Sequence, residues 1–360
     1  MISTRDVIRR IETLAPPSLA EDWDNSGLQA GDQDKEVERV LVALTPLPEV
    51  FDEAEDKGAD FLLFHHPLIF GSLASVDTSS YPGNLLYRAI QTNTTVYAAH
   101  TSYDAAPDGV SVALAETLDL RGPLGIISPK GFLKKLVVFA PEENVEGVAG
   151  ALDRAGAGVI GDYTHCAFRS KGEGTFLPGD SATPHLGARG NLEKVDEIRL
   201  ETVVPAHLAK DAVEAARTAH PYEEMAHDVY PVEGSPEGCG YGRVGSLDTA
   251  LSPEGLAEHV SEKLGFPARL VADSKPKREI ERVAVLGGSG GSFIRQAAAS
   301  GADAYVTGDL DYHDCLLAES LGLAAIDAGH AATELPALEP LAKRLAGLAG
   351  IPVEVSKVRR

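Results

Sequence analysis

The chain has 360 residues, a formal net charge of −22 at pH 7, an apolar content of 44% and three cysteines. This length predicts two or three domains, and so large a negative charge argues against binding to the phosphate backbone of nucleic acids. Three isolated cysteines, no apolar run of about 18 residues and no signal-peptide core predict a cytoplasmic protein without disulfides, thiolate zinc sites or membrane spans.

Residues 1–128 are expected to form a first α/β domain, because strand-like and helix-like patterns alternate along them. In chain order the features are an apolar stretch at 41–44, Gly58-Ala59-Asp60, an apolar run at 61–64 that ends in His65-His66-Pro67, and the segment from His100 to Asp104. Such alternation favours a mainly parallel sheet covered by helices. Polar side chains that follow buried strands lie where α/β proteins bind ligands.

Residues 129–245 have a different pattern and are expected to form an inserted domain. The predicted elements are a strand at 135–139, a helix at 145–154, strands at 165–175 and 197–204, a helix at 208–220 and a strand at 227–231. This β-α-β-β-α-β order is typical of a ferredoxin-like unit, an antiparallel sheet with helices on one face. The segment 178–191, rich in Gly, Pro and Ser, is expected to be a loop between its middle strands.

Residues 246–360 are expected to form a second α/β domain that repeats the first. Ile280-Glu281-Arg282-Val283 and Gly301-Ala302-Asp303 lie 243 positions after Val37-Glu38-Arg39-Val40 and Gly58-Ala59-Asp60. Asp309 likewise lies 243 positions after His66. His330 and Glu334 lie 230 positions after His100 and Asp104. The shared spacing predicts a duplicated core of two similar halves, which the inserted domain interrupts.

Five side chains form the ligand set of a divalent metal site, namely His65, His66, Asp104, His330 and Glu334. Pro67 turns the chain so that two adjacent imidazoles can serve one cluster, and His330 and Glu334 share a helix face. Three neutral imidazoles and two carboxylates suit two divalent ions with a bridging carboxylate; one ion with five ligands is a simpler option that the spacing also allows. Zn, Fe, Mn, Co and Ni all accept such ligands.

The ligand residues have plainer alternatives. His65 and His66 could be a surface pair, although the flanking residues Phe64 and Leu68 are apolar. Glu334 could be an acid in a first helical turn that accepts backbone N–H groups. The presence of two matching His-x-x-x-acid segments favours the metal site over both of these alternatives.

Three further polar residues, His100, Asp309 and His313, are expected to orient ligand imidazoles through the other ring nitrogen. The alternative is that they are polar residues that close strand ends. The Gly-rich segment 287–292 could hold an anion at a helix start, but no Walker lysine follows it. We expect it to be a tight turn against the metal pocket.

With these motifs, the chain resembles the NGG-interacting-factor-three-like family of dinuclear metal proteins, often called GTP cyclohydrolase I type 2 homologues. The matching stretches are 23–28, 65–70, 100–106, 307–309 and 327–334, with 220–224 and 238–245 resembling the long bacterial form. The resemblance implies an α/β/α core of two similar halves, a PII-like inserted domain, and a ring-shaped homohexamer with metal sites facing an internal cavity.

The resemblance places the family's metal ligands on the same five residues, with Glu334 in the bridging position. It implies a dinuclear metal centre, and the family name implies GTP ring opening. The first hypothesis for function is a metal-dependent hydrolase, in which metal-activated water attacks a nucleotide or related small molecule and His100 or His313 moves protons. The alternative is a non-enzymatic, metal-binding regulatory hexamer whose inserted domain senses a ligand. Ser102-Tyr103 and Thr45-Pro46-Leu47 depart from the family's pattern and could change what enters the pocket.

Overall fold

The computed structural model describes residues 2–130, 133–232, 234, 236, 238–275 and 279–359. The chain divides into two compact units, a core unit of Met1–Lys130 with Gly238–Arg360 and an inserted unit of Gly131–Glu237. Both expected α/β halves therefore lie in one compact unit. The inserted unit ends at 237 and not at the expected 245, because strand β12 (Gly240–Leu251) pairs with β7 (Arg121–Pro129) and β14 (Ile280–Ser289) of the core unit.

The first sheet of the core unit has the strand order β17-β4-β5-β6-β2. Its strands are β2 (Gly27–Ala30), β4 (Val40–Ala43), β5 (Phe61–Phe64), β6 (Thr95–Ala98) and β17 (Val353–Val355). Strands β17, β4, β5 and β6 run parallel, and β2 pairs antiparallel with β6. A separate two-stranded sheet joins β1 (Ile2–Ser3) to β3 (Glu36–Val37).

Strands β4 and β5 are apolar at every position because both of their faces are covered. Val42 and Leu63 pack with α1 (Thr4–Leu14) and α12 (Leu338–Ala349) on one face. Leu62 and Phe64 pack with α2 (Pro48–Lys57) and α3 (Gly83–Gln91) on the other. Successive residues of a strand point to opposite faces, so an uninterrupted apolar run is what a sheet between two helical layers requires.

The second sheet of the core unit has the order β13-β16-β15-β14-β12-β7. It adds β13 (Arg269–Ala272), β15 (Ala304–Gly308) and β16 (Ala324–Asp327), and β14, β15 and β16 run parallel. Val285 and Val306 pack with α8 (Pro253–Leu264) on one face. Tyr305 and Ala325 pack with α9 (Ile294–Ala299) and α10 (Tyr312–Leu321) on the other. The core unit is thus a layered α/β structure.

One hydrogen-bond pattern occurs in both sheets. The carboxylate of Asp60 accepts the backbone N–H groups of residues 38–39, just before β4. The carboxylate of Asp303 accepts those of residues 281–282, at the start of β14. Each acid thereby joins the beginning of one parallel strand to the beginning of the next, and donors and acceptors in the two sheets are 243 positions apart.

In each sheet, a short helix follows the third parallel strand in chain order. Helix α4 (Thr101–Asp104) follows β6 and continues to α5 (Val110–Thr117), and α11 (His330–Glu334) follows β16. The carboxyl ends of both parallel strand sets therefore lead directly into the predicted metal ligands. In the part of the chain that the structure describes, no helix is long and apolar enough to cross a bilayer, and Cys166, Cys239 and Cys315 are free thiols.

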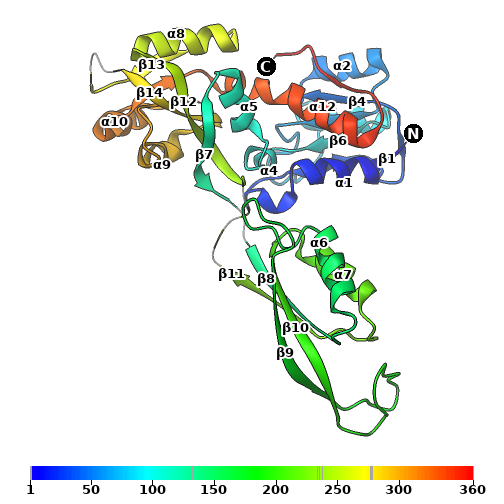
Figure 1. Cartoon of the computed structure of the whole chain (residues 1–360). Helices are drawn as coiled ribbons and strands as arrows, with labels where there is room; N and C mark the ends of the chain where they lie inside the picture. The colour runs from blue at the N-terminus through cyan, green and yellow to red at the C-terminus, as the bar shows by residue number, and fades with distance from the viewer. Residues whose placement is uncertain are drawn as a thin grey trace. The chain divides into compact units, whose positions relative to one another are not determined.

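The inserted unit contains one antiparallel sheet of order β11-β8-β10-β9. Its elements are β8 (Leu133–Ala140), α6 (Val145–Arg154), β9 (Ala167–Phe176), β10 (Glu193–Pro205), α7 (Ala209–Ala219) and β11 (His227–Val232), in the predicted β-α-β-β-α-β order. Figure 1 shows α6 and α7 side by side on one face of this sheet, where Val148 and Ala212 pack with Val138 and Leu200.

Candidate metal centre

His65 and His66 directly follow β5, at the carboxyl end of the parallel strands. Their backbone N–H groups donate to carbonyl oxygens at the end of β4, so both residues continue that ladder. Nδ1 of His65 lies 3.0 Å from the carbonyl oxygen of Ala99, and Nδ1 of His66 lies 3.0 Å from the hydroxyl of Thr45. Because Nδ1 of each ring has a partner, Nε2 is the nitrogen left to meet a ligand or an ion.

Glu334 lies between the imidazoles of both sheets. Its Oε1 atom is 3.2 Å from Nε2 of His330 and 3.5 Å from Nε2 of His65, and its Oε2 atom is 3.1 Å from Nε2 of His66. Glu334 ends α11, and its side chain caps no helix N–H group. A first-turn capping role is therefore excluded, and the carboxylate faces three imidazoles.

Asp104 joins the group from α4, with Oδ1 3.5 Å from Nε2 of His65. Despite these close contacts, three buried atoms in this group form no hydrogen bond of acceptable geometry: Nε2 of His65, Oδ1 of Asp104 and Oε2 of Glu334. Leaving a buried polar atom unsatisfied costs about 1–3 kcal/mol each. A divalent cation bound among these atoms would satisfy all three, so the donor set fits a metal ion.

The structure thus brings all five predicted ligands together, and His65, at 2% exposed, is not part of a surface pair. Candidate ligand atoms of His66, His330 and Glu334 lie within 4.8 Å of one another, as do those of His65, His66 and His100. These two overlapping groups share His66.

The Gly-rich segment 287–292 lies against this cluster, as its sequence predicts. A Cβ atom on Gly288 would lie only 2.5 Å from Oε1 of Glu334, and the φ of Gly288 is +75°. Both the close approach and the left-handed backbone require glycine. The hydroxyl of Thr333 accepts the Gly288 N–H at 2.9 Å, which fixes the turn to α11.

Burial and charge act in opposite directions on the pKa values of the cluster. Burial lowers the pKa of His65, but the Asp104 and Glu334 carboxylates outweigh it and raise that pKa to about 9. The hydrogen bond to Glu334 raises the pKa of His330 to about 9. Burial raises the pKa of Asp104 to about 6. Despite burial, the surrounding imidazoles hold the pKa of Glu334 well below its usual range. Protons and a cation therefore compete for the same nitrogen atoms.

Two of the residues expected to orient the ligands differ in their placement. Oδ2 of Asp309 lies 2.6 Å from Nδ1 of His330, which is the expected orienting contact. His313 is not brought to the cluster. It lies exposed in the first turn of α10, with its ring edge-on to Tyr312, and it does not line the cavity described below. The capping of α10 by Asp311 starts the helix there and leaves its first turn in solvent.

The third such residue, His100, is itself held by an acid that the sequence motifs did not single out as a site residue. Nδ1 of His100 lies 2.8 Å from Oδ1 of Asp24, whose side chain is fully buried. Asp24 also accepts the hydroxyls of Ser26 and Thr101. Burial would raise the pKa of Asp24, but these hydrogen bonds hold it well below its usual range. His100 is thereby fixed with its ring edge-on to that of His65.

A cavity of about 620 Å³ lies over the cluster. His66, His100, Asp104, His330 and Glu334 line it, together with the carboxylate of Glu21 and five aromatic rings, those of Trp23, Phe70, Tyr81, Tyr241 and Phe293. The sequence departures at Ser102 and Tyr103 do not line it. Tyr103 is buried, and its hydroxyl donates to the Ala337 carbonyl oxygen at 3.2 Å.

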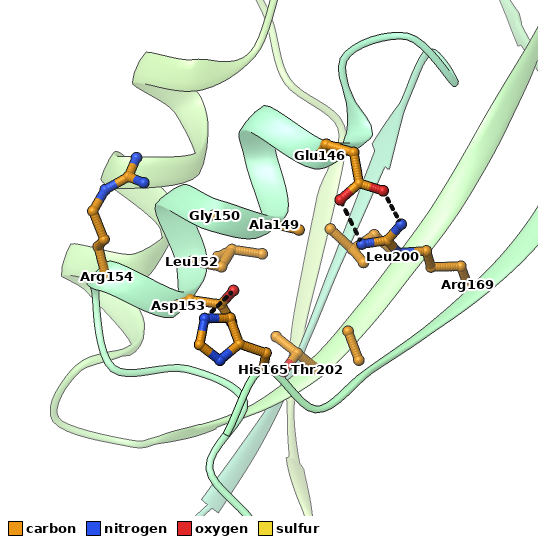
Figure 2. A pocket seen from close by; sticks show the side chains of 11 residues that line it. Glu146, Ala149, Gly150, Leu152, Asp153, Arg154, His165, Arg169, Leu200 and Thr202 are labelled. Carbon is orange, nitrogen blue, oxygen red and sulfur yellow. Dashed lines mark hydrogen bonds and ion pairs between the residues drawn. The ribbon is translucent and has the colours of Figure 1, made fainter. Parts of the chain in front are cut away.

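A second cavity, of about 600 Å³, lies in the inserted unit between α6 and the sheet (Figure 2). Four charged side chains line it, those of Glu146, Asp153, Arg154 and Arg169, together with the imidazole of His165. Arg169 forms a two-pronged ion pair with Glu146, and Nε2 of His165 lies 3.6 Å from Oδ2 of Asp153. Among the described residues, none that lines this cavity carries a buried polar side-chain atom without a hydrogen-bond partner, in contrast to the cluster of the core unit.

Comparison with solved structures supports this architecture. A Bacillus cereus protein related to NIF3 is 39% identical, with a TM-score of 0.87 over 99% of this chain and 97% of that one. A Staphylococcus aureus protein is 30% identical, with a TM-score of 0.75 over 99% of this chain and 97% of that one. Both comparisons extend over the core and inserted units.

Curated relatives extend over nearly the same length. The Bacillus subtilis (strain 168) protein named GTP cyclohydrolase 1 type 2 homolog is 42% identical over 337 residues, which cover 93% of this chain and 90% of that protein. A Mycobacterium bovis protein of the same name is 39% identical, with coverage of 92% and 88%. A family model matches residues 2–360, and the chain therefore belongs to the Duf34/NIF3 (NGG1p interacting factor 3) family.

Proposed function

We propose that this protein is a metal-dependent hydrolase that holds two divalent ions with His65, His66, Asp104, His330 and Glu334 and acts on a nucleotide or a related small molecule. The observation that carries the proposal is the convergence of three buried atoms without hydrogen-bond partners, each on a different member of this set. Imidazoles and carboxylates together accept Zn, Fe, Mn, Co or Ni. The name of the curated relatives makes GTP ring opening the first reaction to test.

The position of Glu334 favours two ions over one. Its two oxygen atoms face different imidazoles, Oε1 toward His330 and His65 and Oε2 toward His66. A carboxylate with both oxygens so placed suits the bridging position. When bound, such an ion pair would supply a water of lowered pKa as nucleophile and would polarise the substrate.

The protein's own groups would then orient and move protons. Asp309 holds the His330 ring through Nδ1, and the Ala99 carbonyl holds the His65 ring in the same way. His100 lines the cavity, and with its Nδ1 held by Asp24 it keeps Nε2 for the reacting group. We assign His100 the role of general acid or base.

We further propose that the core unit arose by duplication and that the inserted unit is a PII-like domain. The repeated carboxylate contact of Asp60 and Asp303, 243 positions apart, supports the duplication. The β11-β8-β10-β9 order with two helices on one face supports a ferredoxin-like insertion. Assembly as a homohexamer is proposed from the family resemblance, and sedimentation of the purified protein tests it.

The decisive experiment pairs metal analysis with turnover. The full chain is purified without added metal, its metal content is measured by mass spectrometry, and GTP with a panel of nucleotides, phosphoesters and cyclic amides is assayed. Two ions per chain and turnover that Asp104→Ala abolishes would support the hydrolase. Bound metal without turnover of any substrate, with Asp104→Ala losing only metal, would refute catalysis and favour the regulatory assembly.

A further inference from the structure

The cavity over the cluster has a rim of exposed aromatic rings. Trp23 is 61% exposed, Phe70 69% and Tyr81 59%, and all three line the cavity. They come from separate loops, before β2, after His66 and before α3. Large apolar side chains gathered at the mouth of a cavity mark a binding site.

The rings that line the cavity include two tilted pairs, each within contact distance. The ring centroids of Trp23 and Phe70 lie 6.1 Å apart at an interplanar angle of 53°, so the two rings are not stacked on each other. Tyr241 and Phe293 form a second pair in the cavity lining, with centroids 5.3 Å apart. Planar heterocycles stack on such rings, and each base–aromatic stack contributes strongly to binding.

Without bound metal ions, the charged side chains that line the cavity oppose a phosphorylated ligand. Its carboxylates are Glu21, Asp104 and Glu334, and within the described part of the chain neither lysine nor arginine lines it. In the metal-free protein a triphosphate would therefore meet three carboxylates and no ammonium or guanidinium group in the cavity lining, in a chain whose net charge is −22. The aromatic rim therefore suits an uncharged ring better than a polyanion.

Glu21 offers a hydrogen-bond acceptor beside the rim. Its Oε1 accepts the Tyr241 hydroxyl at 2.8 Å and lies 2.7 Å from Nζ of Lys130. Both of these contacts fall on one oxygen, so Oε2 can accept an N–H group of a ligand. The ion pair with Lys130 keeps this acceptor ionised.

We infer that this cavity binds an uncharged planar nitrogen heterocycle, whose ring packs against the aromatic rings of Trp23 and Phe70 and whose N–H edge donates to Glu21. The inference rests on the proposed function, because it names the substrate class of the same site and narrows it to rings without a phosphate chain. Trp23, Phe70 and Glu21 bind and orient the ring in this arrangement, and the candidate metal ligands lie beside it in the same cavity.

Trp23 makes the test direct, since it is the single tryptophan of the chain. Its emission is followed in the metal-loaded full-length protein during titration with guanosine, with free N-acetyltryptophanamide correcting for absorption by the ligand. We expect saturable quenching. Phe70→Leu should weaken guanosine binding about fivefold or more, as loss of a stacking contact would. Glu21→Gln should weaken guanosine but not caffeine, which lacks an N–H donor.

The matched control is Phe168→Leu, because Phe168 is 66% exposed but belongs to the inserted unit and is not among the residues that line this cavity. It should leave guanosine binding unchanged. In chelator-treated protein GTP should bind more weakly than guanosine, and inorganic triphosphate should not bind. Tighter binding of GTP or triphosphate that does not depend on Phe70 would overturn the inference. So would an unchanged emission, or emission that changes with protein concentration alone, which would make the rim a subunit contact.

The outcomes separate this inference from the proposed function. Turnover of another substrate with bound metal, but no response of Trp23 to guanosine, would reject the ring site and leave the hydrolase. Guanosine binding that depends on Phe70 and Glu21, in a protein without metal or turnover, would reject the hydrolase and leave the ring site.

Discussion

Asp24 holds His100 through a 2.8 Å contact between Oδ1 and Nδ1, although 76 residues separate them. Asp309 holds His330 in the same manner, through a 2.6 Å contact to Nδ1. In each sheet, therefore, one carboxylate fixes the imidazole that follows the third parallel strand. Such contacts select the tautomer and the orientation of the ring.

Asp24→Asn should destabilise the protein and disorient His100. The amide keeps the shape of the side chain but replaces one acceptor oxygen with a donor, facing the hydroxyls of Ser26 and Thr101. We expect a loss of about 1–3 kcal/mol in the free energy of unfolding, the cost of unsatisfied buried groups. Turnover should fall while bound metal is retained, as measured by denaturant unfolding, activity and metal content.

The pH dependence of this loss has a definite sign. The pKa of Asp24 is depressed in the folded protein, so its stabilisation is present above the unfolded pKa of about 3.9 and disappears as pH falls through the folded value. The stability difference between wild type and Asp24→Asn should therefore shrink in acid. Exposed Asp22→Asn in the same loop serves as control. A difference that stays constant with pH would contradict this role for Asp24.

The clustering of the five candidate ligands was predictable because local patterns encode most of it. His65 and His66 end an apolar strand, and His330 and Glu334 are one helical turn apart, so short-range spacing suffices. The Asp24–His100 pair and the rim formed by Trp23 and Phe70 were not predictable, because they join loops that meet only when the sheets are assembled.

The remaining differences from the sequence-based prediction are also tertiary. His313 follows an apolar strand as His66 does, but the cap at Asp311 begins a helix there and leaves it in solvent. The inserted unit ends at 237 and not at 245 because β12 pairs with β7 and β14, and the local pattern does not reveal this long-range pairing. The helices and strands of both units, in contrast, were predictable from the periodic spacing of apolar residues.

Glu334→Ala should lower the metal content of the protein more than a substitution of Asp309 or His313. Glu334→Ala takes away the one carboxylate that faces three imidazoles, so metal content after dialysis should fall to a small fraction of wild type. Asp309→Asn should weaken metal binding about 10- to 100-fold by releasing the His330 ring. His313→Ala should have no effect, since this residue lies exposed on α10. A greater metal loss in His313→Ala than in Glu334→Ala would mean that the assignment is reversed.

Metal uptake should release protons and strengthen with pH. His65 and His330 have pKa values raised to about 9, so near neutral pH a cation must displace their protons. Apparent metal affinity should rise from pH 7 to about 9 and level off above it. Calorimetry in buffers of different ionisation heats measures the released protons. An affinity independent of pH would show that these imidazoles are not ligands.

The same two pKa shifts predict how the metal-free protein responds to alkali. Because the folded pKa values of these imidazoles are raised, their protonation stabilises the folded protein fully below the unfolded pKa of 6.5. That stabilisation is lost as pH rises through about 9. The melting temperature of chelator-treated protein should therefore fall between pH 7 and 9. Metal-loaded protein should not show this fall, because its ligand imidazoles are already neutral.

Gly288→Ala should abolish metal binding without unfolding the core unit. The new Cβ would lie 2.5 Å from Oε1 of Glu334, so the carboxylate must leave its position between the imidazoles. The alanine would also have to adopt a φ of +75°, which strains its backbone. We expect metal content to fall as in Glu334→Ala, together with a loss of about 1–3 kcal/mol from the strained backbone. Metal analysis and denaturant unfolding report the two effects separately.

Gly347→Ala is the matched control for this substitution. Gly347 lies within α12, and a Cβ there has no atom within 4 Å. Alanine in a helix interior is favoured over glycine by about 1 kcal/mol, so this variant should be more stable and should retain its metal. If Gly288→Ala kept full metal content at wild-type affinity, the close approach to Glu334 would not be what positions the carboxylate. Loss of metal in both variants would instead indicate a global effect of backbone substitution.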